Sequence, residues 1–198
     1  FLEDYSLMIR GLIALYQTTF NEKWILTARE LMKYTLDHFY DAKSGLFFFT
    51  SDGQKDLSKR EIELDDGVIP SSNSTGAHNL FILGRYFENT DWENLSKEML
   101  LRMKEALSQN LTSYSNWGSL YLAHSFPFYD VAISGQKANH FAHEMRKNPR
   151  SNILVAGSEK ASEIPIMRNR FKINHTLIYM CKDKVCAAPV EKPEIIVF

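Results

Sequence analysis

The chain has 198 residues, of which 44% are hydrophobic and 13% aromatic, so it is long enough for one domain with a substantial core. Its formal net charge of −1 excludes the broad positive field that recruits nucleic acid or an anionic membrane surface. No apolar run approaches the roughly 20 residues that a membrane span needs, and the first residues do not resemble a signal peptide. We therefore expect neither nucleic-acid nor membrane partners.

The chain begins at Phe1 rather than at methionine, and it has only two cysteines. Its first residue suggests a piece of a longer polypeptide, and two cysteines do not make a disulfide scaffold. A reducing cytoplasm is therefore the expected location, unless a preceding segment carried a targeting signal.

The N-terminal part predicts a helix hairpin. Apolar residues recur at helical spacing over residues 4–20 and 24–39, and Asn21 between them is a plausible N-cap. The short link makes the two helices antiparallel. A long connection follows over residues 41–73, in which GLFFFT can form a short strand and SDGQKDLSKREIELDDG reads as a polar loop. Loops of this length are typically functional or disordered.

Three further helices are predicted over residues 74–87, 92–107 and 117–125, and Pro127 ends the last of them. Because the longer connections precede the first, third and fifth helices, these three point the same way and their N-terminal ends share one face. That face carries the strings FLEDY, ELDDGVIPSSNS and YSNW. Repeated helix hairpins of this kind are typical of toroids and solenoids.

The pattern changes after the fifth helix. FYDVAIS and SNILVAG read as strands on either side of the helical string GQKANHFAHEMRKN, which predicts a βαβ unit with parallel strands. After a helical or irregular piece, residues 176–190 predict a hairpin in the same sheet, with Asp183 and Lys184 at its tip. The predicted fold is therefore mainly α, with helix hairpins over residues 1–126 and a small α/β element over 127–198.

Three strings, FLEDYSLMIRGLIALYQTTFNEKW, DGVIPSSNSTGAHNLFILGR and VCAAPV, resemble the C-terminal part of one family. It is the family of thioredoxin-domain proteins that includes the spermatogenesis-associated thioredoxin-like protein. The resemblance spans essentially the whole chain. It implies an N-terminal thioredoxin-like domain followed by an (α/α)6 toroid, similar to N-acylglucosamine 2-epimerase and the six-hairpin glycosidases.

This resemblance implies that the chain holds only part of the toroid. The sequence predicts about two and a half helix hairpins, whereas a closed (α/α)6 ring needs six. An arc of this kind leaves two apolar edges uncovered. We therefore expect a partner to cover them, either the missing N-terminal part of the same protein or a second copy of the chain.

Asp65 and Asp66 are the first candidates for chemistry. Hydrolysis or epimerisation of a sugar needs a proton donor and an acceptor near one ring, and carboxylates commonly supply both. Adjacent residues in an extended loop point opposite ways, so at most one of the two faces a given pocket. The alternative is a solvated acidic loop in which Asp66 and Gly67 form a turn.

Other polar residues lie at the same helix ends. Glu3 and Asp4 precede the first helix, where acidic residues also serve as caps and complement the helix dipole. Asn73 and Ser74 are expected to cap the third helix, and Asn73 can also offer its amide to a sugar hydroxyl. His78 lies one turn further on and is a candidate general base, although a histidine on a helix is more often structural.

Three aromatic residues, Tyr5, Tyr114 and Trp117, are expected at the mouth, where they could stack on sugar rings unless they belong to the core. His140 and His143 are three residues apart, without the glutamate of a zinc motif or an obvious third ligand. We therefore expect no metal, and because the sequence has no Gly-rich phosphate loop we expect no cofactor either.

Cys181 and Cys186 flank the string KDKV. If Asp183 and Lys184 form a two-residue turn, the two cysteines are directly opposite and close enough for a disulfide. The alternative is a pair of reduced, partly buried thiols, which suits a reducing cytoplasm.

Two functions follow from these patterns. One is a carbohydrate-binding or carbohydrate-processing pocket of the epimerase or glycosidase kind. The other is a non-catalytic scaffold or docking module for the absent thioredoxin-like redox domain. An enzyme requires two ionisable side chains that converge in an aromatic-lined mouth, whereas a scaffold uses its carboxylates singly as caps. The sequence leaves open whether the chain is an enzyme.

Overall fold

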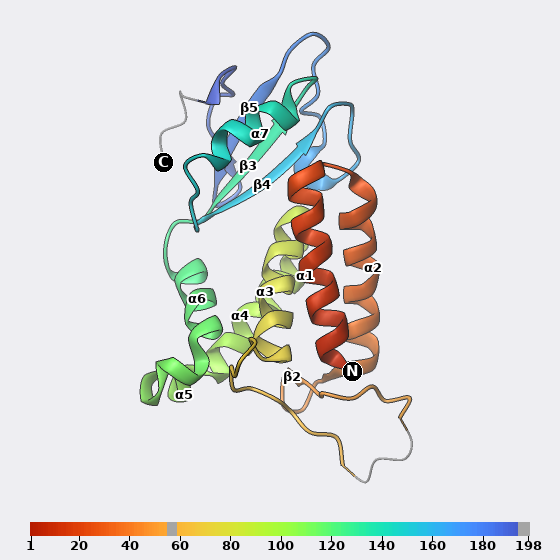
Figure 1. The fold of residues 1–198 in the computed structure, drawn as a ribbon, viewed down its shortest axis with the longest axis vertical. Coiled ribbons are helices and arrows are strands. Elements are labelled where there is room, and N and C mark those ends of the chain that lie inside the picture. Colours follow the sequence, from red (N-terminus) through yellow and green to blue (C-terminus); the bar gives the residue numbers. More distant parts are fainter. Residues whose placement is uncertain (55–58, 194–198) are drawn as a thin grey trace.

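The computed structural model describes residues 1–54 and 59–193. A layer of helices carries a small sheet at one end, and a long loop runs beneath the opposite end (Figure 1). Within the polar loop predicted from SDGQKDLSKREIELDDG, residues 55–58 lie outside the described residues.

The first helix hairpin is confirmed. Helix α1 (Leu2–Thr19) and helix α2 (Glu22–Phe39) are joined by a tight link in which Phe20 adopts a φ of 52°. The predicted cap of α2 is also confirmed, because the Asn21 side chain accepts a hydrogen bond from the Lys23 N–H at 3.1 Å. The predicted strand GLFFFT is reduced to two residues, since β1 (Tyr40–Asp41) pairs with β2 (Leu46–Phe47).

The next two predicted helices need correction. Helix α3 (Ser72–Tyr86) begins two residues before the predicted start, because its N-cap is Ser71. The helix predicted over residues 92–107 is split into α4 (Thr90–Arg102) and α5 (Lys104–Gln109). The break is at Met103, which is buried and whose N–H bonds to the Leu100 carbonyl at 3.0 Å. This tighter turn ends the regular α-helical pairing.

The last helical element is short. A 3₁₀ turn (Leu111–Tyr114) leads directly into α6 (Ser115–Ser125), which therefore begins two residues before the predicted start. Helix α3 contacts α1, α4 and α6. The N-terminal ends of α1, α3 and α6 lie toward the same end of the layer (Figure 1).

The predicted βαβ unit and hairpin are both confirmed. The strand order is β4-β3-β5-β6, with β3 and β4 parallel and the other neighbours antiparallel. Asp183 and Lys184 form the hairpin tip with positive φ, as a two-residue turn requires. The elements are β3 (Tyr129–Ser134), α7 (Ala138–Arg146), β4 (Ile153–Ser158), a 3₁₀ turn (Pro165–Met167), β5 (Leu177–Lys182) and β6 (Val185–Cys186).

The sheet and the helical layer share one core. One face of the sheet carries Ala132, Leu154 and Ala156, which pack with the helices, whereas α7 covers the opposite face. Two buried tyrosines tie the layers together: the Tyr16 hydroxyl donates to the Gly157 carbonyl at 3.3 Å, and Tyr86 donates to a neighbouring β4 carbonyl at 2.7 Å. The fold is thus mainly helical with small sheets. That its helices are part of a toroid remains a prediction.

Candidate functional site

The acidic loop before α3 ends in a network centred on Asp66. One carboxylate oxygen accepts hydrogen bonds from the Ser71 N–H at 2.9 Å and from the Ser74 hydroxyl at 2.8 Å. The other oxygen accepts from the Asn116 N–H at 2.8 Å, in the first turn of α6. Two helix starts therefore share one carboxylate, which also complements both helix dipoles.

The prediction that Asn73 or Ser74 caps α3 is wrong, because Ser71 is the N-cap. The Ser71 hydroxyl, and neither Asn73 nor Ser74, accepts the capping bond from the Ser74 N–H, at 3.2 Å. A second carboxylate, which the sequence reasoning missed, lies at this end of α3: Glu63 accepts from the Ser72 hydroxyl at 2.7 Å and from its N–H at 3.1 Å. The sequence signal for this contact was Glu63 itself, a further acidic residue ahead of the helix.

Asn73 lies deep inside the molecule and bonds only to backbone in the described contacts. Its carbonyl oxygen accepts from the Phe47 N–H at 2.8 Å. Its amide donates to the Phe47 carbonyl at 2.8 Å and to the Glu63 carbonyl at 2.9 Å. The Asn73 side chain thus makes the hydrogen bonds to β2 that a neighbouring strand would otherwise make. Because it is fully buried and both its oxygen and its nitrogen are engaged, it has no access to a sugar hydroxyl.

His78 joins the same network through Asn116. Its Nε2 lies 2.8 Å from the Asn116 carbonyl, which can only accept, so Nε2 carries the proton. The Ser119 hydroxyl donates to the same carbonyl at 2.8 Å and lies 3.1 Å from Nε2. Burial lowers the pKa of His78, which favours the neutral ring. A protonated Nε2 cannot act as a base toward Ser119.

The remaining predicted residues divide into two groups. Trp117 is fully buried and its indole N–H donates to the Leu64 carbonyl at 3.0 Å, so neither ring face is open to a ligand. Tyr114 lies at the end of the 3₁₀ turn that precedes α6. Its hydroxyl is hydrogen-bonded to the Asp65 carboxylate, which raises the pKa of the hydroxyl.

At the start of α1, the side chains of Tyr5 and Asp4 are engaged elsewhere. Tyr5 stacks on Tyr34 of α2 with ring centroids 5.1 Å apart. Asp4 pairs with the N-terminal amine of Phe1 at 3.0 Å, with most of its side chain in solvent. Glu3 lies in the first turn, where its carbonyl accepts from the Ser6 hydroxyl. None of these described contacts joins them to Asp66.

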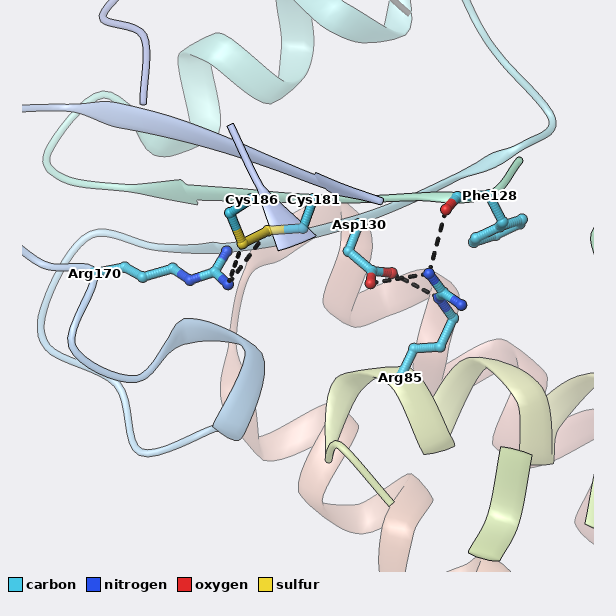
Figure 2. The surroundings of a disulfide bond; sticks show 6 residues. All are labelled: Arg85, Phe128, Asp130, Arg170, Cys181 and Cys186. Atoms are coloured by element: carbon cyan, nitrogen blue, oxygen red, sulfur yellow. Dashed lines mark hydrogen bonds and ion pairs between the residues drawn. A yellow bond between two sulfur atoms is a disulfide. The ribbon is translucent and has the colours of Figure 1, made fainter. Parts of the chain in front are cut away.

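A second polar cluster, centred on the disulfide, lies where the sheet meets the helices (Figure 2). Asp130, Cys181 and Cys186 are register partners across β3, β5 and β6, so their side chains share one face of the sheet. The two cysteines form a disulfide with an S–S distance of 2.02 Å. The Arg170 Nη2 lies 3.5 Å from each sulfur.

An ion pair connects this cluster to α3. Arg85 Nε donates to Asp130 at 2.7 Å, and Nη2 donates to the other carboxylate oxygen at 3.0 Å and to the Phe128 carbonyl at 3.3 Å. The guanidinium also lies over the Phe81 and Phe128 rings. Burial raises the pKa of Asp130, and the Arg85 charge offsets part of that effect.

The ion pair and the disulfide line one cavity of about 50 Å³, with Glu93 and Lys184 among its other lining residues. The Lys184 ammonium lies 3.4 Å from the Glu93 carboxylate, which docks the hairpin tip against α4. Cys181 and Cys186 were candidates from the sequence, whereas Arg85 and Arg170 were not, because each arginine reaches this cluster only through the tertiary fold.

Within the described residues, no three His, Cys, Asp or Glu side chains are grouped closely enough to hold a metal ion. None of the described helices has the length and apolar character of a membrane span.

No family model matches the chain. The chain is similar to spermatogenesis-associated protein 20, with 22% identity to the human protein and 23% to the rat protein, covering 98% of the chain. An uncharacterized protein of Caenorhabditis elegans is 23% identical over 96% of the chain. The chain spans about a quarter of the length of these curated relatives, 26% for the human protein.

Proposed function

We propose that the chain is a non-catalytic helical docking module, the second of the two functions that the sequence suggests. The observation that carries this proposal is an exposed apolar stripe on α1. Met8 and Leu15 are 57% and 44% exposed, and they lie seven residues apart on one helix face. Gly11 and Ala14 are exposed on the same face and are small enough for close approach of another helix.

The Asp66 network supports this proposal over catalysis. A proton donor or acceptor needs a free oxygen that faces a substrate, whereas Asp66 accepts three hydrogen bonds from protein groups. His78 donates to a backbone carbonyl from the nitrogen nearest Ser119. These residues are engaged as caps and positioning groups, which is the arrangement expected of a scaffold.

The partner that fits the α1 stripe is another helix. Helix α1 already packs against both α2 and α3, so a further helix on its open face would add a second layer to the bundle. The relatives are about four times as long as this chain, so they have polypeptide that could supply such a helix. In a solution of this chain by itself, the partner is a second copy.

Light scattering across a range of concentrations tests the proposal. The unmodified chain should have a molar mass above that of the monomer, and the mass should rise with concentration. Met8→Glu combined with Leu15→Glu should abolish association, while the control Thr27→Glu on exposed α2 surface should leave it unchanged. A monomer at every concentration, or equal association of all three proteins, would contradict the proposal.

Carbohydrate binding is the second candidate, favoured by the Asp65–Tyr114 pair at the rim of the α3 and α6 helix starts. A rim carboxylate beside an aromatic ring suits a sugar, which needs a hydroxyl acceptor and a stacking face. Calorimetry with N-acetylated and neutral hexoses tests it. Millimolar binding that Asp65→Asn weakens would support this function, and no heat of binding would count against it.

A further inference from the structure

The two cysteines of the disulfide differ in their exposure to solvent. Cys186 is exposed and belongs to β6, the edge strand of the sheet. Cys181 is only 2% exposed and lies on β5, between β3 and β6. A thiolate arriving from solvent therefore reaches Cys186, and the sulfur that departs is that of Cys181.

Arg170 is held beside these sulfurs. Its guanidinium lies over the Tyr179 ring at 5.2 Å, and the Tyr179 hydroxyl donates to the Arg170 carbonyl at 3.1 Å. Its Nη2 lies 3.5 Å from both sulfurs, and its buried Nη1 has no hydrogen-bond partner among the described residues. A neutral disulfide is a weak acceptor, so this cation has donor capacity that a thiolate would use.

We propose that Cys181 and Cys186 are a thiol–disulfide exchange site, in which Arg170 stabilises the departing Cys181 thiolate. The co-reactant is a thiol, either a small molecule or a protein dithiol. Its thiolate attacks Cys186 Sγ, the bond between the two protein sulfurs breaks, and the electron pair stays on Cys181. A second thiolate then attacks the mixed disulfide, which releases the oxidised co-reactant. Two electrons and two protons pass from the co-reactant to the cysteines.

Among the described residues that line the cavity, the other two cations are already paired with carboxylates, so Arg170 is the cation that can stabilise the Cys181 thiolate. Asp130 is paired with Arg85, and Glu93 is paired with Lys184. Among the described residues, the one other charged side chain that lines the cavity is Glu88. The cavity of about 50 Å³ has room for a few water molecules, and it gives the two sulfurs space to separate.

The hairpin does not depend on the disulfide for its pairing. Lys182 pairs with Val185 at the turn, and Ile178 exchanges two backbone hydrogen bonds with Val190, at 2.8 and 3.0 Å. Reduction therefore leaves the strands in place, and the two thiols remain near each other for reoxidation.

The test treats the folded chain with reduced glutathione in one arm and with a reduced protein dithiol in the other. Free thiols are then blocked with N-ethylmaleimide and counted by mass spectrometry. The native protein should be reduced in at least one arm, with the trapped mixed disulfide on Cys186. Arg170→Met should slow reduction at least tenfold, and Arg170→Lys should restore part of the rate. The control Arg168→Met removes an exposed charge two residues away and should react like the unmodified chain.

Either of two results would overturn the proposal: a disulfide that both reductants leave intact until urea unfolds the protein, or equal rates for Arg170→Met and Arg168→Met. If Arg170→Met does not fold, the ultraviolet absorbance of the thiolate in the reduced, unmodified protein decides. The midpoint of its pH titration should lie at least one pH unit below the ordinary cysteine pKa of about 8.5, and an ordinary midpoint would overturn the proposal.

Discussion

The molecule has two polar clusters that differ in how fully their groups are engaged. Around Asp66, both carboxylate oxygens accept hydrogen bonds from the starts of α3 and α6, and the neighbouring Asn73 amide is bonded to backbone. Around the disulfide, Arg170 has one buried nitrogen without a hydrogen-bond partner among the described residues. A fully bonded cluster stabilises the fold, whereas spare donor capacity beside a reactive bond can serve chemistry.

The contrast reverses what the sequence suggests. The acidic loop carries the residue types of a sugar-processing site, yet the structure uses Asp66 as a shared cap. The disulfide hairpin sits at the end of the chain, yet it meets Arg170 and the Arg85–Asp130 pair at the junction with the helices (Figure 2). Substitutions in the first cluster should therefore change stability, and substitutions near the disulfide should also change reactivity.

The largest loss of stability is expected from Asp130→Ala, because Arg85 would be left in the core without its bidentate partner. Removing one partner of a buried pair costs about 3 to 4 kcal/mol. Urea unfolding measures this loss, and the control Asp37→Ala on exposed α2 surface should change stability by no more than about 0.5 kcal/mol. Equal free energies of unfolding for the two variants would show that the junction is not held by this pair.

Asp66→Ala should lower the free energy of unfolding by about 2 to 3 kcal/mol, because two backbone N–H groups and one hydroxyl lose a charged acceptor. Asp65 is the neighbouring exposed carboxylate and provides the matched control. If Asp65→Ala is as destabilising as Asp66→Ala in thermal or urea unfolding, the shared-cap account is wrong.

Replacing both cysteines by serine should cost about 2 kcal/mol, because the disulfide closes only a short loop and chain entropy scales with loop length. Differential scanning calorimetry of the oxidised, reduced and double-serine proteins measures the effect. All three should unfold in one cooperative transition. Loss of that transition on reduction would mean that the disulfide holds the sheet together.

The smallest effect concerns pH and His124, whose Nε2 lies 3.1 Å from the Ser96 hydroxyl. Burial and then the nearby Lys97 charge lower the pKa of His124 to about 4. In the unfolded chain the pKa of His124 is near 6.5, so the unfolded chain binds this proton more tightly than the folded chain does. The stability from His124 is therefore complete above pH 6.5 and is lost as pH falls toward 4, by about 1 kcal/mol after allowance for solvent screening.

The measurement compares urea unfolding at pH 7 and pH 4.5 for the unmodified chain and for His124→Gln. The variant should lose less stability than the unmodified chain over this interval. His143→Gln, on exposed α7 surface, is the control and should behave like the unmodified chain. Identical pH dependence of all three proteins would show that His124 does not contribute to the loss of stability at low pH.

Much of the fold could be predicted from local signals. Helical spacing and the Asn21 cap predict the first hairpin, and β-branched strings around a helix predict the parallel βαβ unit. The split at Met103 could not be predicted, because the periodic pattern continues through it and only tertiary packing buries that side chain. The start of α3 was misplaced because Ser71, Ser72, Asn73 and Ser74 are all plausible caps by residue type.

The candidate sites were harder to predict than the elements. The pairing of Cys181 with Cys186 follows from hairpin register, a local property. The role of Asp66 depends on Asn116, fifty residues away in sequence, and a single sequence does not indicate that contact. Arg170 likewise reaches the sulfurs from an irregular segment, for which hydrophobic periodicity gives no direction.

The Asp66 carboxylate holds the starts of two helices, and amide hydrogen exchange tests this arrangement most directly. In Asp66→Ala, protection of the Ser71 and Asn116 amides should fall together by about tenfold to a hundredfold, as expected for a loss of about 1.4 to 2.7 kcal/mol in local opening. Protection at both amides should be unchanged in Asp65→Ala. Unchanged protection at either amide in Asp66→Ala would contradict the shared cap.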